Sequence, residues 1–385
     1  MPSLDIIIAG AGMGGLSAAL ALQQAGHRVR LYERARELAP IGAAISIWPN
    51  GVKVLERLGL GSAIAAVSGD MRSMSYHAHQ GQLLTRFSLL PLYEAVGLPA
   101  RPIARAHLQR LLLEAVGTEP VTLGVGCEAV EQDEQGVTVR LSDGRLERAD
   151  LLVAADGTHS RLRDWVVGQA ITRDYCGYVN WNGRVKIAPD LADAHEWAQF
   201  VGDHQRVSLM PMGGDEFYFF FDVPLPKGTP NDRSRYREEL AGHFAGWAPP
   251  VQRLIERLDP QGVARVEIHD TRPLPTLVRG RVALLGDSAH AMAPDLGQGG
   301  CQAMEDAWVL ARCLDAETDP LAALQAYEQA RLERVAGIVE RARKRCEITH
   351  GHDPAATQAW YAELAQETGE TVIAGLRKTA DGGPL

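Results

Sequence analysis

The sequence has few cysteines, and they are not arranged to crosslink the chain or bind zinc. There are five, at positions 127, 176, 301, 313 and 346. An odd number without a C-x-x-C pair favours free thiols in a reducing cytoplasm. His77 with His79, and His350 with His352, form two pairs, but no carboxylate–cysteine cluster completes either set. We interpret all four as surface histidines and expect no metal.

The chain also lacks a basic stripe and a long apolar run. Its formal net charge is −9, so we expect no nucleic-acid partner. No apolar stretch approaches the roughly 18 residues of a membrane span, so we expect no membrane association. Asp5 and the glycine turn after it lead us to expect no signal peptide. The 385 residues, 46% of them hydrophobic and 23% charged, are typical of a soluble globular enzyme with two domains.

Apolar periodicity predicts an α/β chain. Residues 5–10, 14–26 and 28–34 read as strand, helix and strand, one βαβ unit of a parallel sheet. Residues 137–145 predict a hairpin with an Asp-Gly turn. Two unmixed apolar runs, 149–156 and 281–287, are typical of strands buried on both faces.

The middle of the chain differs from both ends. Residues 173–270 are rich in β-type segments separated by turn residues, which predicts an antiparallel sheet followed by a helical piece. From about residue 319 the pattern is amphipathic and helical. The β-rich part therefore interrupts the α/β part, and the first domain is discontinuous.

The stretch GAGMGG at residues 10–15 is a G-x-G-x-x-G that follows a predicted strand and opens a predicted helix. Gly10 permits the turn, Gly12 lets the backbone approach a pyrophosphate, and Gly15 allows close helix–strand packing. Glu33 follows about 20 residues later, where a carboxylate accepts the hydroxyls of an adenosine ribose. Strand, glycines, helix and acid together predict a dinucleotide site.

Two further stretches carry polar residues at strand ends. AADGTHSRLR contains Asp156, Gly157, Ser160 and Arg163; by itself it is equally consistent with a strand ending in a turn. In RVALLGDSAHAMAPDLGQGG, Asp287 follows a strand and can take the hydroxyls of a ribityl chain. The later glycines expose N–H groups at a helix start, which suits the anionic edge of a reduced flavin.

One rival interpretation concerns Ser288. GDSAH resembles the G-x-S-x-G turn that presents a hydrolase nucleophile, but its fifth position is His290 rather than glycine. We therefore disfavour a hydrolase.

The three stretches, in this order, resemble the single-component FAD-dependent aromatic hydroxylases. That family often has two alanines where Ser288 and Ala289 stand here. The absence of a second G-x-G-x-x-G implies that the nicotinamide cofactor binds transiently. The resemblance implies a non-covalent FAD site made of Gly10, Gly12, Gly14, Gly15, Glu33, Arg34, Ser46, Arg105, Asp156, Asp287, Gly297, Gln298, Gly299, Gly300 and Cys301. Arg105 is read from PIARAHLQ as a contact near the pyrophosphate, the alternative being a solvated helix charge.

The implied architecture is an α/β fold: a Rossmann-like FAD-binding domain, an inserted β-rich substrate domain and a C-terminal helical segment. We assign residues 1–70, 101–172 and 271–318 to the FAD-binding domain. Residues 71–100 and 173–270 form the substrate domain, and 319–385 form the C-terminal helices.

A closer resemblance extends from the first strand to the last helix. IGAAISIWPNGVKVLERLGL, GYVNWNG, RVSLMP, FYFFFDVPLP, FAGWAPPVQRLI and ARKRCEITHG are similar to bacterial FAD-dependent urate hydroxylases. That family oxidises urate at C5 to 5-hydroxyisourate with NADH and O2, through a C4a-hydroperoxyflavin. The resemblance implies a cytoplasmic flavoprotein monooxygenase of urate degradation. Neither the oligomeric state nor a preference between NADH and NADPH can be predicted.

The expected substrate site lies on the β-rich domain. Strand alternation puts Arg206, Ser208 and Met210 on one face, and Arg206 offers a planar fork to a purine anion. By resemblance the urate-binding set is Asn180, Arg206, Tyr218, Phe219 and Phe220, the two phenylalanines through their backbone. We expect Arg206, Tyr218 and Asp295 to act in catalysis by orienting urate, with Asp295 near the flavin and able to pair with Arg206.

Each of these residues also has a purely structural interpretation. The aromatic run is compatible with plain core, Arg206 with a solvated strand charge and Asp295 with a turn before a helix. Two other functions also remain open: hydroxylation of a benzoate-type aromatic acid, and a non-catalytic FAD-binding protein.

Overall fold

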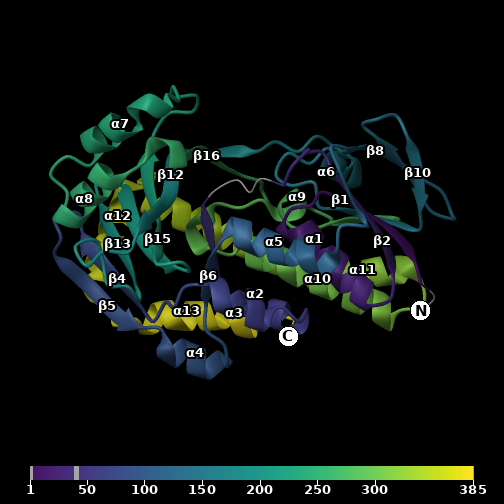
Figure 1. The fold of residues 1–385 in the computed structure, drawn as a ribbon, viewed down its shortest axis with the longest axis horizontal. Coiled ribbons are helices and arrows are strands. Elements are labelled where there is room, and N and C mark those ends of the chain that lie inside the picture. The colour runs from purple at the N-terminus through teal and green to yellow at the C-terminus, as the bar shows by residue number, and fades with distance from the viewer. Residues whose placement is uncertain (1–2, 39–42, 385) are drawn as a thin grey trace.

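The computed structural model describes residues 3–38 and 43–384. Residues 1–2, 39–42 and 385 lie outside this part of the chain, and they include Ile41 at the start of IGAAISIW. Two large sheets lie at opposite ends of the molecule, with most helices between them (Figure 1). The predicted α/β fold class is confirmed.

The first sheet has six strands in the order β17-β18-β11-β1-β2-β7. All neighbours pair in parallel except β17 with β18. Ile6, Ile7 and Ile8 are fully buried, as expected for a strand covered on both faces. The bounds are β1 Asp5–Ala9, β2 Arg28–Glu33, β7 Val121–Leu123, β11 Leu151–Ala154, β17 Val278–Arg279 and β18 Val282–Leu284.

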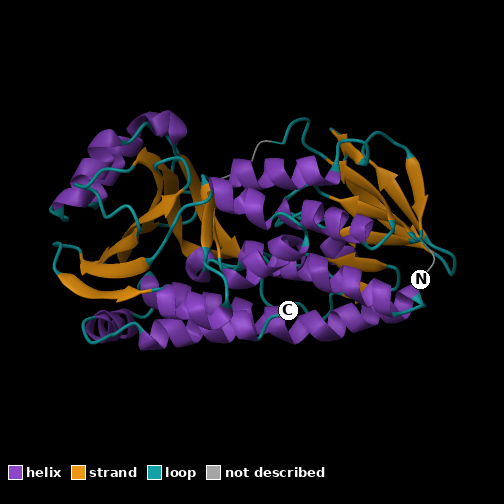
Figure 2. Cartoon of the chain, turned by 60° about the horizontal axis from the view of Figure 1, so that its bottom comes forward, coloured by secondary structure: helices purple, strands orange, loops and turns teal. Residues whose placement is uncertain are grey.

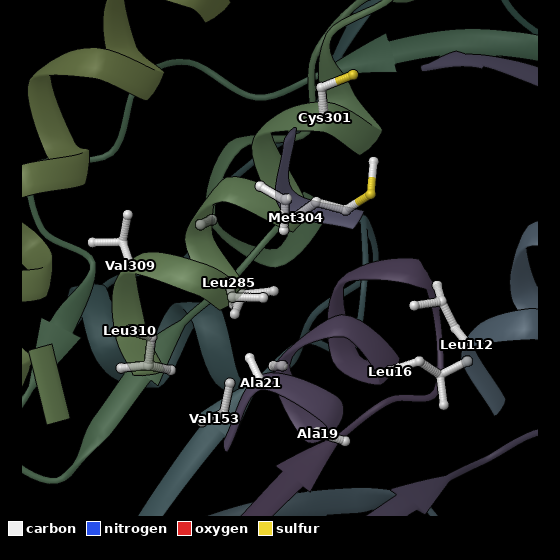
Figure 3. Packing of buried hydrophobic residues seen from close by; sticks show 14 of the residues in the cluster. Leu16, Ala19, Ala21, Leu112, Val153, Leu285, Cys301, Met304, Val309 and Leu310 are labelled. Carbon is white, nitrogen blue, oxygen red and sulfur yellow. The ribbon is translucent and has the colours of Figure 1, made fainter. Parts of the chain in front are cut away.

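Helices α1 (Met13–Gln24), α5 (Arg105–Val116) and α10 (Gly299–Ala316) pack together beside this sheet. Figure 3 shows part of this packing, where Leu16 of α1 lies beside Leu112 of α5. Small residues such as Ala19 and Ala21 let α1 lie close to its neighbours. This packing fixes the start of α1, where the glycine motif lies.

Two small antiparallel sheets accompany the two large ones. The predicted hairpin is confirmed: β9 (Val137–Leu141) and β10 (Leu146–Ala149) flank the Asp-Gly turn, and β8 (Cys127–Gln132) pairs with β9. Gly144 in that turn has φ +88°, which favours glycine. β3 (Ala44–Ile47) pairs with β6 (Arg101–Ala104) and lies beside the start of α10.

The second sheet has seven strands in the order β16-β12-β15-β14-β13-β4-β5. Pairing within residues 173–270 is antiparallel, as predicted, whereas β4 joins β13 in parallel. Segments 71–100 and 173–270 thus share one sheet, although the domain boundaries themselves stay a prediction. The bounds are β4 Ser73–Ala78, β5 Leu83–Ser88, β12 Asp174–Lys186, β13 Glu196–Gly202, β14 Gln205–Met212, β15 Glu216–Pro224 and β16 Ala264–Asp270.

One face of this sheet packs against α7 (Tyr236–His243) and α8 (Pro249–Arg257). Val207, Leu209 and Phe219 point into that core, so Arg206 and its alternating neighbours point the other way. Smaller helices complete the connections: α2 Pro49–Arg57, α3 Gly61–Val67, α4 Leu90–Val96 and α6 Leu162–Val167.

The C-terminal segment is helical, as predicted. α11 (Pro320–Thr349) is followed by α12 (Pro354–Leu364) and α13 (Glu370–Asp381), and the long helix runs along one side of the molecule (Figure 2). The Tyr327 hydroxyl of α11 donates to the Leu284 carbonyl in the first sheet, at 2.8 Å. The other end of α11 contacts β12, so one helix spans both sheets. Among the described helices none combines the length and apolarity needed to cross a membrane.

Candidate active site

The G-x-G-x-x-G loop joins β1 to α1. Gly10 has φ +102°, and a Cβ there would lie 2.3 Å from the Ala155 carbonyl oxygen. A Cβ on Gly15 would lie 1.9 Å from the Gly10 oxygen, so both positions require glycine. A Cβ on Gly14 would meet Leu285, where α1 packs closely. Gly12 instead faces open space and leaves the start of α1 accessible.

A pocket of about 290 Å³ opens at the carboxyl ends of β1, β2 and β11. Glu33 lies on its wall, and its carboxylate accepts from the N–H groups of Ala11 and Ala35, both at 2.8 Å. The predicted residues Gly10, Gly12, Glu33, Arg34 and Asp156 all line it. Gly126, Cys127, Glu128 and Ser142 also line it, and the sequence analysis did not identify them. No motif marks these four, because they lie at the ends of β8 and β9 in the hairpin sheet, which only tertiary packing brings here. His159 and Arg161 line it too and lie within the stretch AADGTHSRLR.

Asp156 is held at one oxygen and unpartnered at the other. Its Oδ2 accepts from the Arg161 N–H at 3.1 Å, while Oδ1 is buried without a partner among the described residues. Burial raises the pKa of Asp156. Ser160 helps to begin α6 by accepting from the Arg163 N–H at 2.9 Å.

The buried Arg163 side chain joins this stretch to the GDSAH stretch. Its Nη1 lies 3.4 Å from the Asp287 carbonyl oxygen. Asp287, at the start of α9 (Asp287–His290), is exposed at the end of β18. A Cβ on Gly299 would lie 3.9 Å from Asp287 Oδ1, so the acid faces the glycine run.

The hydrolase interpretation of Ser288 is wrong. The side chain is fully buried, and Oγ lies within hydrogen-bond reach of the carbonyls of Ala154 and Leu285. A hydroxyl committed to strand backbone cannot attack a substrate.

The glycine run lies directly against β3. After the turn η3 (Pro294–Leu296), Gly297 has φ +62°, and a Cβ there would lie 2.7 Å from Ser46 Oγ. A Cβ on Gly300 would meet Ile45 at 2.4 Å. The predicted residues Ser46 and 297–300 are thus together. Trp48, which the sequence did not identify, adds an Nε1–H that is buried without a described partner.

Three predicted cofactor residues point their side chains elsewhere. Cys301 Sγ is buried and accepts from the Trp48 N–H at 3.4 Å. The Gln298 amide bonds Asn50 at 3.0 Å. Only the backbone of Cys301 and Gln298 is therefore available to a ligand. Arg105 begins α5 half-buried, and its Nε donates to the Ala44 carbonyl at 3.3 Å, outside the pocket described above.

Arg206 lies on the inner face of the second sheet, as the alternation predicted, and it is buried. Its Nε and Nη2 donate to Asp222 Oδ2 at 2.9 and 2.7 Å. The expected pair with Asp295 is present, Nη2 to Oδ1 at 3.0 Å. The sequence did not identify Asp222 as a partner. None of the described residues accepts a hydrogen bond from Nη1.

The two carboxylates hold the guanidinium and cancel its charge. Burial opposes ionisation, but Asp222 and Asp295 more than offset it and raise the pKa of Arg206. Burial likewise opposes ionisation of Asp295, yet Arg206, His350 and Tyr178 hold its pKa well below the ordinary value. Arg206 is consequently a source of directed hydrogen bonds more than of net positive charge.

The remaining substrate candidates surround Arg206. The Phe220 ring centroid is 5.1 Å from the guanidinium carbon, and the Tyr218 ring is 5.7 Å from that of Phe220. Burial raises the pKa of Tyr218 to about 12. Asn180 donates to Asp222 at 2.7 Å and accepts from Asn182 at 2.8 Å, which leaves one amide hydrogen and one lone pair. The Phe219 side chain lies in the opposite core.

His350 is not a surface histidine, and that expectation is wrong. Its side chain is fully buried, its Nε2 lies 3.2 Å from Asp295 Oδ1, and its ring stacks on Tyr178. His350, Asp295 and Cys346 lie close enough to bracket a cation. Arg206 already occupies the carboxylate, however, and a hydrogen bond to Cys176, together with burial, strongly raises the pKa of the Cys346 thiol. These groups fit an ion pair better than a metal.

Residues 3–342 match the family described as FAD binding domain. A FAD-dependent urate hydroxylase of Klebsiella pneumoniae is 52% identical over 383 residues, which cover 99% of this chain and 100% of the relative. Another, of Mycolicibacterium vanbaalenii, is 49% identical over 386 residues, covering 99% and 98%. This chain belongs to the FAD-dependent urate hydroxylase family.

The three-dimensional likeness within the urate hydroxylase family is equally extensive. Klebsiella pneumoniae HpxO, solved with FAD and uric acid, superimposes with a TM-score of 0.97 at 51% identity, covering 99% of this chain and 97% of that chain. FAD fits the residues present here. Gly12 leaves open space at a helix start, and Asp156 Oδ1 and Trp48 Nε1 are buried polar atoms without a described partner. The site thus has acceptors, donors and a glycine cradle in the order that a dinucleotide requires.

Proposed function

We propose that this flavin monooxygenase hydroxylates urate at C5 to 5-hydroxyisourate, using NADH and O2. Support comes from the likeness to HpxO, which was solved with uric acid, and from the polar and aromatic groups around Arg206. The observation that carries the proposal is the state of Arg206. Two carboxylates fix its plane, while Nη1 has no described acceptor and is therefore available to a ligand.

Urate at neutral pH is a planar anion with nitrogen and oxygen acceptors in the ring plane. A guanidinium whose plane is fixed can meet such an edge with the directed hydrogens of its Nη1 group. Phe220 and Tyr218 offer flat apolar surface beside it. Because the pKa of Tyr218 is about 12, its hydroxyl remains protonated and can donate to a urate oxygen. These residues would bind and orient the ring.

The cofactor would lie between the two halves of the site. Gly10, Gly12 and Glu33 would hold its adenosine and pyrophosphate, and Asp287 its ribityl chain. The backbone of residues 297–300 would face the ring. When bound, reduced FAD supplies oxygen activated at C4a, the electrophile that the electron-rich C5 of urate requires. The buried surroundings of Arg206 exclude water from that reaction.

The direct test is NADH oxidation by FAD-loaded protein, titrated with urate and separately with salicylate, with the products identified. We expect urate to stimulate NADH consumption and to yield 5-hydroxyisourate. Hydroxylation of salicylate in preference to urate would favour the benzoate-type alternative. No stimulation by either would favour a non-catalytic flavoprotein.

We also propose a cytoplasmic location. It is supported by the five cysteines, all of which are free thiols in the described structure.

A further inference from the structure

The Asp295 carboxylate is hydrogen-bonded by side chains from three separate parts of the fold. Arg206 of β14 donates to Oδ1 at 3.0 Å. His350, just past the end of α11, places Nε2 3.2 Å from the same oxygen, and Tyr178 of β12 donates to Oδ2 at 2.9 Å. All of these side chains are buried. The C-terminal segment therefore reaches the residue that pairs with Arg206.

His350 and Tyr178 also support each other. Their rings stack with centroids 3.7 Å apart and planes 20° from parallel. The stack limits rotation of either ring, so the two donors approach Asp295 from fixed directions. Asp295 itself lies in the three-residue turn η3, and its described side-chain partners are Arg206, Tyr178 and His350. Its orientation thus depends on these neighbours.

We propose that His350 and Tyr178 are positioning residues for urate hydroxylation, acting through Asp295 to fix the plane of Arg206. This inference rests on the proposed function. Asp295 bridges the arginine and the glycine run that begins at Gly297, so a rotated carboxylate would misalign the urate fork relative to the flavin edge. A small misplacement of the ring is enough to separate oxygen activation from oxygen transfer.

One feature distinguishes this role from plain core packing. The His350 Nδ1 is buried without a partner among the described residues. Loss of the imidazole also removes one of the three partners of the buried Asp295 carboxylate, so some loss of stability accompanies either role. A positioning role predicts in addition a change in urate KM and coupling, which core packing alone would not alter.

The test uses four variants of the FAD-loaded enzyme. His350→Leu removes the donor, and His350→Gln keeps an N–H close to the Nε2 position. Tyr178→Phe removes only the hydroxyl, and His352→Gln alters the exposed histidine two residues away as a matched control. The readouts are urate KM, 5-hydroxyisourate formed per NADH oxidised, peroxide yield, FAD content and Tm.

We expect His350→Leu to raise urate KM by about tenfold and to lower product per NADH several-fold, with peroxide making up the difference. FAD content should stay close to wild type, whereas Tm should fall because Asp295 loses one of its three partners. His350→Gln should recover most of the coupling, Tyr178→Phe should show a smaller loss, and His352→Gln should match wild type.

Wild-type coupling and KM in both His350→Leu and Tyr178→Phe would overturn the inference, as would a His350→Gln variant no better than His350→Leu. If His350→Leu failed to fold, His350→Gln and Tyr178→Phe would decide alone; normal coupling in both would assign a structural role only. A wild-type enzyme that did not hydroxylate urate would instead refute the proposed function.

Discussion

Three arginines are buried among the described residues, and two of them, Arg206 and Arg331, each pair with two acids in closely similar surroundings. Arg331 of α11 bonds Glu305 and Asp306 on α10, each at 2.6 Å. Asp306 in turn bonds the buried His290 at 2.6 Å. Arg206 of β14 likewise bonds two acids, Asp222 and Asp295, and the second acid also bonds a buried histidine, His350.

The difference lies in the donors that remain. All three guanidinium nitrogens of Arg331 donate hydrogen bonds, because Nη2 also donates to Gln302 Oε1 at 2.7 Å. In Arg206 only Nε and Nη2 donate hydrogen bonds to described residues. Burial and ion pairing therefore do not separate a structural arginine from a binding one. These two arginines differ in the Nη1 group that Arg206 keeps without a described acceptor, since such a donor is available to a ligand or to water.

Arg331→Met should give the largest effect, and on stability alone. Removing one member of a buried ionic network leaves Glu305 and Asp306 uncompensated, so the free energy of unfolding should fall by about 3–5 kcal/mol. Chemical denaturation with FAD present measures it. Arg312→Met, an exposed arginine bonded to Asp315, is the control and should stay within about 0.5 kcal/mol. A near-neutral Arg331→Met would break the comparison.

Arg206→Gln should chiefly affect urate turnover. A lost charge-assisted contact is worth roughly 1.5–3 kcal/mol, so kcat/KM for urate should fall by one to two orders of magnitude. FAD content should not change, since none of the predicted cofactor residues bonds the Arg206 side chain. Because the two acids lose their partner, Tm must be recorded beside activity. Unchanged kcat/KM would remove Arg206 from the site.

Tyr218→Phe should show a milder loss of urate kcat/KM, equivalent to about 1 kcal/mol, from one neutral hydrogen bond. Burial raises the Tyr218 pKa to about 12, so the hydroxyl stays protonated at every lower pH. A profile of kcat/KM between pH 6 and pH 10 should therefore contain no step that Tyr218→Phe abolishes. Such a step would show that Tyr218 ionises in the reaction.

Asp156→Asn should slightly stabilise the FAD-free protein while weakening FAD retention. Burial raises the Asp156 pKa in the folded state, so its carboxyl contributes stability at pH values below the unfolded pKa of about 3.9 and loses it as pH rises through the raised value. The gain from asparagine should be on the order of 0.5–1 kcal/mol at pH 7 and vanish toward pH 4. Equal Tm values at pH 7 would contradict this.

Much of the fold follows from local signals. Apolar runs, glycine turns and the Asp-Gly hairpin are each encoded within a few residues, and these elements were predicted at the correct places. The parallel pairing of β4 with β13 was not, because it unites segments on either side of residues 101–172, the middle segment of the FAD-binding domain. No local pattern specifies which edge of a sheet a distant hairpin will extend.

The residues of the candidate site likewise fall into those that local signals predict and those that tertiary contacts bring in. Glu33, Asp156 and Asp287 follow strands of one parallel sheet, so their clustering was predictable. Trp48 and His350 reach the site through tertiary contacts that carry no sequence signature. Asp222 was accessible to sequence reasoning: it lies directly opposite Arg206 in the β14–β15 pair, and a register for that hairpin would have shown the opposite charges facing each other.

The central claim is that Arg206 serves urate through the direction of its donors, since Asp222 and Asp295 already balance its charge. Arg206→Lys tests it most directly, because lysine keeps the charge and loses the planar fork. The measurement is 5-hydroxyisourate formed per NADH oxidised by FAD-saturated enzyme at saturating urate. The account predicts that Arg206→Lys is uncoupled about as severely as Arg206→Gln, with peroxide as the main product. Coupling close to wild type in Arg206→Lys, beside an uncoupled Arg206→Gln, would show that charge alone suffices and would contradict it.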